Sequence, residues 1–107
     1  MNDKTIVFKH HTNDLGEVLA AADAELIGKT LKEGKITFIV SKTFYSGEEI
    51  TEDELGVQLL EAGNINLVGE KCVNTAMRKG ILGEKNIIRI QGVPHAQVYK
   101  LNSTGGY

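Results

Sequence analysis

Hydrophobic and polar residues alternate near the N-terminus of the chain. Between residues 5 and 9, Ile6 and Phe8 point to one side and their neighbours to the other, which predicts a half-buried β-strand. The segment HHTNDLG at 10–16 is rich in turn-forming residues, and residues 17–22 can return as a second strand. The sequence therefore predicts a β-hairpin at this end.

A second hairpin is predicted between residues 87 and 101, where the strand-like segments IIRI and AQVY flank QGVPH. Gly92 frees the backbone shortly before Pro94, and a proline favours an extended conformation at the residue that precedes it. We expect Pro94 and His95 to lie in the connecting loop, which then fixes the direction of the histidine.

The region after the first hairpin carries helical signals. Asp23 stands where a helix N-cap belongs, and residues 24–33 place apolar side chains at helical spacing. Gly34 is expected to end this helix in the left-handed conformation. The segment ITFIV at 36–40 is apolar at nearly every position, which predicts a central strand covered on both faces. We expect FYSGEEI, residues 44–50, to be a loop.

A second helix is predicted to begin at Thr51, because TEDE forms a capping box in which Thr51 and Glu54 bond each other's backbone. Gly63 and Asn64 either separate this helix from a third one or mark a weak point in one long helix. The apolar side of the second helix is expected to consist of Leu55, Leu59, Leu60 and Ala62.

Helical spacing of apolar residues continues from Ile65 to Ala76, and Gly80 is expected to end that helix. In this interpretation Gly69 lies inside the helix and packs closely against the sheet. Asn66 and Glu70 are four residues apart and would present polar groups on one helix face.

Hairpins with helices between them predict an α+β domain, with a mostly antiparallel sheet and two to three helices packed on it. The 107 residues, 41% hydrophobic and 24% charged, are typical of one folded domain. We expect it to span residues 1–101, with a flexible tail at 102–107. The chain shows no signal peptide and no apolar run long enough for a bilayer, which predicts a cytoplasmic protein without a membrane partner.

No cofactor or metal is expected. His10 and His11 are adjacent, so they point to opposite sides of an extended chain and do not easily chelate one ion together. Cys72 lies on the apolar stripe of its predicted helix and is expected to be a buried thiol. Zinc-ligand spacings and phosphate-binding loops are absent from the sequence.

Four segments, EVLAAADAELIGKTLKEG, FYSGEEI, NLVGEKCV and NIIRIQGVPHAQV, cover most of residues 17–98. The more specific pieces are GVPHAQ at 92–97 and NLVGE at 66–70. Together these segments resemble an archaeal family of small proteins known as domain of unknown function 424, and HHTND lies outside the resemblance. The resemblance implies an intracellular archaeal protein and supplies no reaction.

The net charge of −2 argues against a protein coated with positive charge for nucleic-acid binding. A local basic patch is predicted where the last helix meets the second hairpin, and the acidic residues of segment 48–54 cluster elsewhere. Such a surface would meet RNA or an acidic protein. The patch consists of Lys71, Arg78, Lys79 and Arg89.

The leading hypothesis is a non-catalytic binding module in an RNA-handling or translation-related assembly, with RNA, a ribonucleoprotein or a protein as partner. The alternative is a small enzyme in which His95 is the general acid or base, although the same side chain can simply bond a backbone carbonyl. A third hypothesis is a homodimer formed through an exposed hairpin edge. The candidate binding residues are Gly92, Pro94, His95, Gln97, Asn66, Glu70, Lys71 and Arg89.

Overall fold

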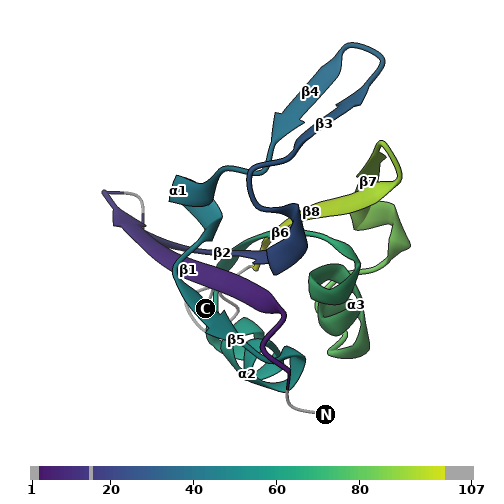
Figure 1. Ribbon diagram of the computed structural model, residues 1–107. Coiled ribbons are helices and arrows are strands. Elements are labelled where there is room, and N and C mark those ends of the chain that lie inside the picture. Colours follow the sequence, from purple (N-terminus) through teal and green to yellow (C-terminus); the bar gives the residue numbers. More distant parts are fainter. Residues whose placement is uncertain (1–2, 15, 101–107) are drawn as a thin grey trace.

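The computed structural model describes residues 3–14 and 16–100, and its central feature is a six-stranded sheet (Figure 1). The strand order is β5–β1–β2–β6–β8–β7, and neighbouring strands are antiparallel except for the parallel pair of β2 and β6. The strands are β1 (Ile6–Asn13), β2 (Gly16–Asp23), β5 (Glu48–Ile50), β6 (Asn64–Val68), β7 (Ile87–Ile90) and β8 (Val93–Tyr99).

Two helices cover one face of the sheet, which we call the helix face. Strand alternation points Ile65 and Leu67 toward these helices, where they pack with Leu55 and Leu59 in a fully buried core. The predicted capping box at the start of the first of these helices is confirmed, because each partner bonds the other's backbone N–H. The helices are α2 (Glu52–Glu61) and α3 (Glu70–Arg78), and the 3-10 turn η2 (Glu84–Asn86) leads from α3 into β7.

The opposite face of the sheet is covered only in part. Helix α1 packs over β1 and β2, where the small side chains of Ala20 and Ala22 leave room for the ring of Tyr45. The hairpin of β3 and β4, which we call the hairpin arm, projects away from the sheet (Figure 1). These elements are η1 (Ala24–Leu26), β3 (Thr30–Glu33), β4 (Ile36–Ile39) and α1 (Lys42–Tyr45).

The predicted fold class is confirmed: the described residues form an α+β domain with a mostly antiparallel sheet and three α-helices. Both predicted terminal hairpins are present as β1–β2 and β7–β8. The predicted tail at 102–107 lies outside the described residues. Among the described residues, no helix is long and apolar enough to cross a membrane.

The helix predicted for residues 24–33 is wrong. Only a 3-10 turn forms, because Gly28 adopts a φ of +87° that interrupts helical geometry and residues 30–33 then pair with β4. Gly34 is left-handed as predicted, with a φ of +59°, but it turns the hairpin arm instead of ending a helix.

Three further predictions also need correction. Residues 36–40 are not a central strand, because β4 lies in the projecting arm and leaves Ile36 and Ile39 49% and 60% exposed. The turn-rich segment 10–16 continues β1 as far as Asn13, because pairing with β2 along the whole strand outweighs the local turn preference. The predicted loop at 44–50 contains the end of α1 and all of β5.

Neither alternative for Gly63 and Asn64 is correct, because α2 ends at Glu61 and residues 64–68 form β6 in the middle of the sheet. The apolar residues at 65 and 68 fit a helical stripe equally well in sequence. Pairing with both β2 and β8 decides the outcome, since tertiary context overrides local pattern.

Gly69 stands at the start of α3, not inside it, and forms part of a buried clasp with Asp23. Its φ of +113° suits glycine, and a Cβ atom there would overlap the carboxyl group of Asp23. The prediction that Asp23 caps the following helix is wrong, because its carboxylate makes no cap bond to η1. It accepts instead the backbone N–H groups of Lys71 and Cys72, each at 3.0 Å. One buried acid therefore ties the end of β2 to the start of α3.

Candidate binding face

His95 lies within strand β8, and the turn of the second hairpin consists of Gln91 and Gly92. The prediction that His95 sits in the loop is therefore wrong. Its Nδ1 lies 2.9 Å from the carbonyl oxygen of Leu67, and its ring packs against Phe38 of the hairpin arm with centroids 4.7 Å apart. The histidine is half-buried between the sheet and the arm.

The contacts of His95 fix which ring nitrogen carries the proton. A carbonyl oxygen only accepts, so Nδ1–H is the donor to Leu67. Burial lowers the pKa of His95, and the bond to Leu67 opposes this shift only in part. The ring is therefore neutral at pH 7, and its Nε2 is left as a hydrogen-bond acceptor.

Asn66 lies one strand away from His95 on the same face, directly opposite Gln97 in the β6–β8 ladder. The hydroxyl of Tyr45 donates to Asn66 Oδ1 at 2.5 Å. Burial raises the pKa of the Tyr45 hydroxyl, so it remains protonated and continues to donate. The bond orients the Asn66 amide so that its oxygen faces Tyr45.

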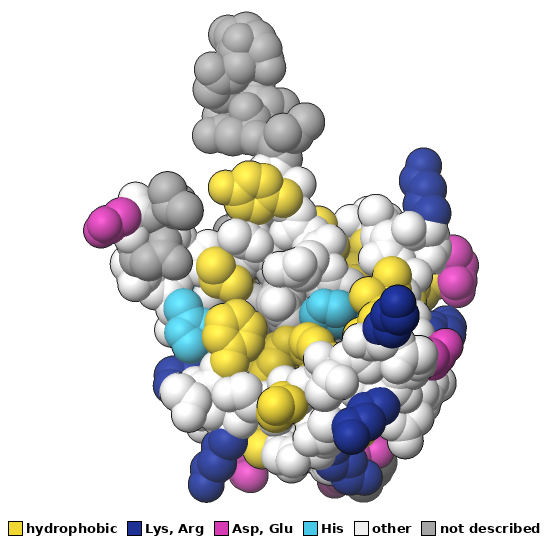
Figure 2. Space-filling view, turned by 90° about the horizontal axis from the view of Figure 1, so that it is seen from above, with side chains coloured by type: hydrophobic (Ala, Val, Ile, Leu, Met, Phe, Trp, Pro, Cys, Tyr) yellow, Lys and Arg dark blue, Asp and Glu magenta, His cyan; other side chains and the backbone are white. Residues whose placement is uncertain are grey.

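These residues belong to what we call the open face: the surface of β6 and β8 opposite α2 and α3, between α1 and the hairpin arm. Figure 2 views the molecule from this side and shows hydrophobic side chains and histidines gathered here, with Lys and Arg side chains around them. Tyr99 is 73% exposed on it. A depression of about 270 Å³ at this end of β6 and β8 is lined by Asn64, Gln97, Val98 and Tyr99. The aromatic side chains of the open face and its walls are Phe38, Phe44, Tyr99, His11 and His95.

One wall of the open face contains a stacked pair that sequence reasoning missed. The rings of His11 and Phe44 are 4.6 Å apart and nearly parallel, and His11 Nε2 lies 2.6 Å from the Phe44 carbonyl oxygen. The prediction that His10 and His11 point to opposite sides is confirmed, because the His10 ring lies on the other side of β1 and meets the edge of Phe8. The stacking partner of His11 comes from α1, 33 residues along the chain, so no local signal could have identified it.

Charge is strongly segregated around this face. Residues 29–42, in the hairpin arm and at the start of α1, carry four lysines and one glutamate, a formal charge of +3. No ion pair joins these lysines to a described carboxylate. Residues 48–54 carry five acidic residues and no basic one, a formal charge of −5.

The basic patch predicted around α3 is not free of acids. Three of its four cations pair with carboxylates: Arg78 with Glu52 at 3.1 Å, Lys71 with Glu25 at 3.5 Å and Arg89 with Glu70 at 3.7 Å. These three carboxylates, of which only Glu52 belongs to the acidic segment 48–54, therefore partly neutralise this patch.

Of the predicted binding residues, the structure brings together Asn66, His95 and Gln97 on the open face. Pro94 is buried, and its carbonyl accepts the N–H of Gly69. Asn66 and Glu70 do not share a helix face, because Asn66 is on β6 and Glu70 begins α3. The remaining predicted residues lie apart from the open face or in the β7–β8 turn: Glu70, Lys71, Arg89 and Gly92.

Cys72 is fully buried on the helix face, as predicted. Burial raises the pKa of its thiol, and the nearby carboxylate of Asp23 raises it further. A nucleophilic thiolate needs the reverse conditions, namely exposure and positive surroundings, so Cys72 is unsuited to act as a nucleophile. Across residues 3–14 and 16–100, no three His, Cys, Asp or Glu side chains cluster closely enough to hold a metal ion.

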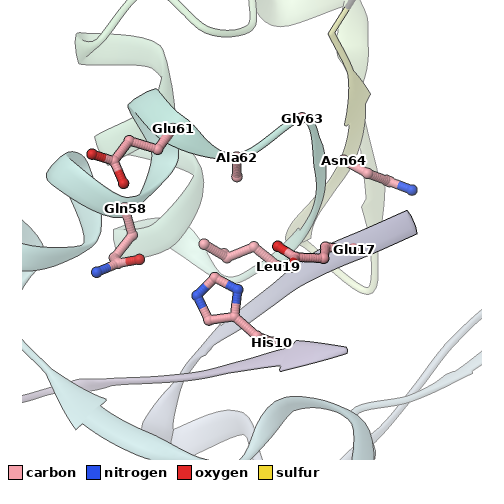
Figure 3. A pocket seen from close by; sticks show the side chains of 8 residues that line it. All are labelled: His10, Glu17, Leu19, Gln58, Glu61, Ala62, Gly63 and Asn64. Carbon is pink, nitrogen blue, oxygen red and sulfur yellow. The ribbon is translucent and has the colours of Figure 1, made fainter. Parts of the chain in front are cut away.

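A separate cavity of about 160 Å³ opens where β1 and β2 meet the end of α2 (Figure 3). Figure 3 shows His10, Glu17 and Gln58 around it, with Leu19 at its base. It lies on the helix side of β1, so His95 does not reach it. The structure thus gives His95 an open surface rather than this pocket.

Fold and site together define a single-domain α+β protein whose mixed six-stranded sheet is covered by helices on one face and left partly open on the other. The chain belongs to the DUF424 family, described as a protein of unknown function, whose sequence profile matches residues 10–101. The predicted resemblance is confirmed, and the match also takes in His10 and His11, which that resemblance left out.

A solved structure supports the same fold. The chain is similar to an uncharacterized conserved protein from Methanopyrus kandleri, with a TM-score of 0.78 and 28% sequence identity. The similarity covers 91% of this chain and 94% of that one. No curated protein matches the chain.

Proposed function

We propose that this protein is a non-catalytic binding module that holds RNA on its open face within an RNA-handling or translation-related assembly. One observation carries the proposal: the exposed ring of Tyr99, several half-buried aromatic rings, side-chain amides and nearby lysines meet on one face. Aromatic rings stack on bases, amides bond base edges, and ammonium groups neutralise phosphates.

The distribution of charge supports an anionic partner despite the net charge of −2. The +3 segment at 29–42 borders the open face, whereas the −5 segment at 48–54 lies at β5, the far edge of the sheet beyond β1 and β2. A polyanion is thus attracted to the arm and repelled from the acidic edge. This asymmetry orients RNA across the open face.

Sedimentation in a density gradient tests the proposal. Lysate of the native cell is run with and without ribonuclease, and the protein is detected in each fraction. We expect the wild type to migrate with heavy particles and to be released by ribonuclease. Migration as a free small protein in both runs would contradict the proposal.

Two charge variants make the gradient specific for the open face. In the arm variant, Lys29, Lys32 and Lys35 are changed to Gln, and we expect it to remain in the light fractions. In the helix-side variant, Lys71, Arg78 and Lys79 are changed to Gln, which removes the same charge elsewhere. It should migrate like the wild type.

The enzyme alternative rests on one favourable observation: His95 is neutral, with Nε2 free to accept a proton, as a general base requires. The open surface around it does not enclose a small substrate as active-site pockets do. A small molecule that raises the melting temperature of the wild type but not of His95→Gln would favour the enzyme.

A further inference from the structure

The open face presents hydrogen-bonding groups whose roles as donor or acceptor are fixed before any ligand binds. Tyr45 occupies the oxygen of the Asn66 amide, so the amide nitrogen is the group left for a ligand. That nitrogen carries two N–H donors. Because Tyr45 is held in the buried layer beneath α1, the orientation of the Asn66 amide does not depend on the ligand.

His95 provides the opposite role, a hydrogen-bond acceptor. Its Nδ1–H is bonded to Leu67, which leaves Nε2 as an acceptor. Packing against Phe38 holds the ring in place. Gln97 lies directly opposite Asn66 and two residues from His95 along β8, so its exposed amide can both donate and accept beside them.

We infer that Asn66, Gln97 and His95 bind the Watson–Crick edge of one unpaired cytosine or guanine in single-stranded RNA. This inference rests on the proposed function and deepens it. Cytosine and guanine carry an acceptor at one end of that edge and a donor at the other, which matches Asn66 and His95. Uracil has acceptors at both ends of that edge, and adenine has only two hydrogen-bonding groups there, so it leaves one of the three side chains without a partner.

We call Asn66, Gln97 and His95 the polar row. The residues around this row can contact the rest of a nucleotide chain. Tyr99 follows Gln97 by two residues on the same face, and its 73% exposed ring can stack on a neighbouring base. The lysines of residues 29–42 border the same face for the phosphates. A duplex hides the edge that the row would bind, so only an unpaired strand fits.

Fluorescence anisotropy with purified full-length protein tests the inference. The probes are oligocytidine, oligouridine and oligoadenosine of about ten nucleotides, near the length that small single-strand binding folds cover, and a duplex of the same length. We expect oligocytidine to bind about tenfold more tightly than the other two single strands, the discrimination that a good bidentate base contact gives. The duplex should bind most weakly.

Asn66→Asp is the informative variant. It keeps an oxygen for the Tyr45 hydroxyl, so the fold is retained, but it replaces the two N–H donors with an acceptor. We expect the preference for oligocytidine to disappear. Thr37→Asp adds the same charge on the exposed arm and should weaken all single strands equally, which separates charge from recognition. Gln97→Ala, at an exposed position, provides a second test that does not endanger folding.

Equal affinity for the three single strands, or a preference that survives Asn66→Asp and Gln97→Ala, would overturn base recognition by this row. So would equal binding of the duplex. If no oligonucleotide binds while the protein still sediments with heavy particles in a ribonuclease-sensitive manner, this inference fails and the proposed function stands. If the protein neither binds nor sediments, both fail.

Discussion

The two faces of the six-stranded sheet differ in how they are completed. On the helix face, α2 and α3 bury an aliphatic core, and the acid Asp23 is enclosed with two backbone donors. On the open face, α1 and the hairpin arm bury only part of the surface. At the edge of this buried part, Tyr45 bonds the side chain of Asn66, and His95 bonds the carbonyl oxygen of Leu67. The helix face is thus closed by two helices, whereas the open face keeps exposed polar and aromatic groups, and it is there that the proposed function places binding.

The largest expected difference in the free energy of unfolding is between two neighbouring leucines of α2. Leu59 is fully buried in the core, whereas Leu60 is 58% exposed, although both belong to the predicted apolar side. Leu59→Ala should lower the free energy of unfolding by about 3 to 4 kcal/mol, because it leaves a cavity. Leu60→Ala should change it by about 0.5 kcal/mol or less. Urea unfolding measures both, and similar losses would contradict this assignment of the core.

The clasp at the start of α3 gives the next largest effect. Gly69→Ala should lower the free energy of unfolding by about 2 to 3 kcal/mol, because the new methyl group meets the Asp23 carboxyl and φ is unfavourable for alanine. Gly63→Ala is the control, since its Cβ would enter open space. Thermal unfolding of both variants, compared with the wild type, checks the prediction. Equal melting temperatures for the two variants would contradict the clasp.

The faces should respond oppositely to pH. Burial raises the pKa of Asp23 above 3.8, so the folded state holds this proton more tightly and the free energy of unfolding falls as pH rises through that raised pKa. Burial lowers the pKa of His95 below 6.5, so the free energy of unfolding falls as pH drops from 6.5 through the lowered pKa.

Urea unfolding between pH 3 and pH 8 separates the two contributions. In Asp23→Asn, the free energy of unfolding should no longer fall with rising pH in the acid range, as it does in the wild type. In His95→Gln, it should no longer fall as the pH drops below 6.5. Wild-type and variant curves that run parallel over the whole range would show that neither group is perturbed by folding.

The smallest effect is expected for the ion pairs around α3. Arg78 and Glu52 are both substantially exposed, at 59% and 40% of their side-chain surfaces. Arg78→Gln should therefore change the free energy of unfolding by about 0.5 kcal/mol or less, because water screens such pairs. A loss comparable to that of Leu59→Ala would mean that the helix face depends on charge as well as packing.

Local signals in the sequence predict the parts of the fold that are decided locally. The capping box at Thr51, the two hairpins and the left-handed Gly34 follow from short-range chemistry. The hairpin arm and β6 could not be predicted in this way. Their apolar residues fit a helix and a strand equally well, and pairing between segments distant in sequence decides between them.

Part of the candidate site was visible in the sequence as well. Asn66, His95 and Gln97 are among the binding residues that the sequence predicts, and β-pairing brings them together. Their partners Tyr45, Leu67 and Phe38 come from other segments, so the donor and acceptor pattern emerges only in three dimensions. The basic border at 29–42 could not be predicted, because the sequence pattern there predicts a helix and a central strand covered on both faces.

Ultraviolet cross-linking tests most directly whether RNA lies on the open face. The protein is irradiated in the ribonuclease-sensitive particles, and the peptides that carry nucleotide adducts are identified by mass spectrometry. We predict adducts in β8 and α1, at aromatic residues such as Tyr99 and Phe44, and in the hairpin arm. Adducts confined to α2 and α3, or their complete absence from particles that contain the protein, would contradict the account.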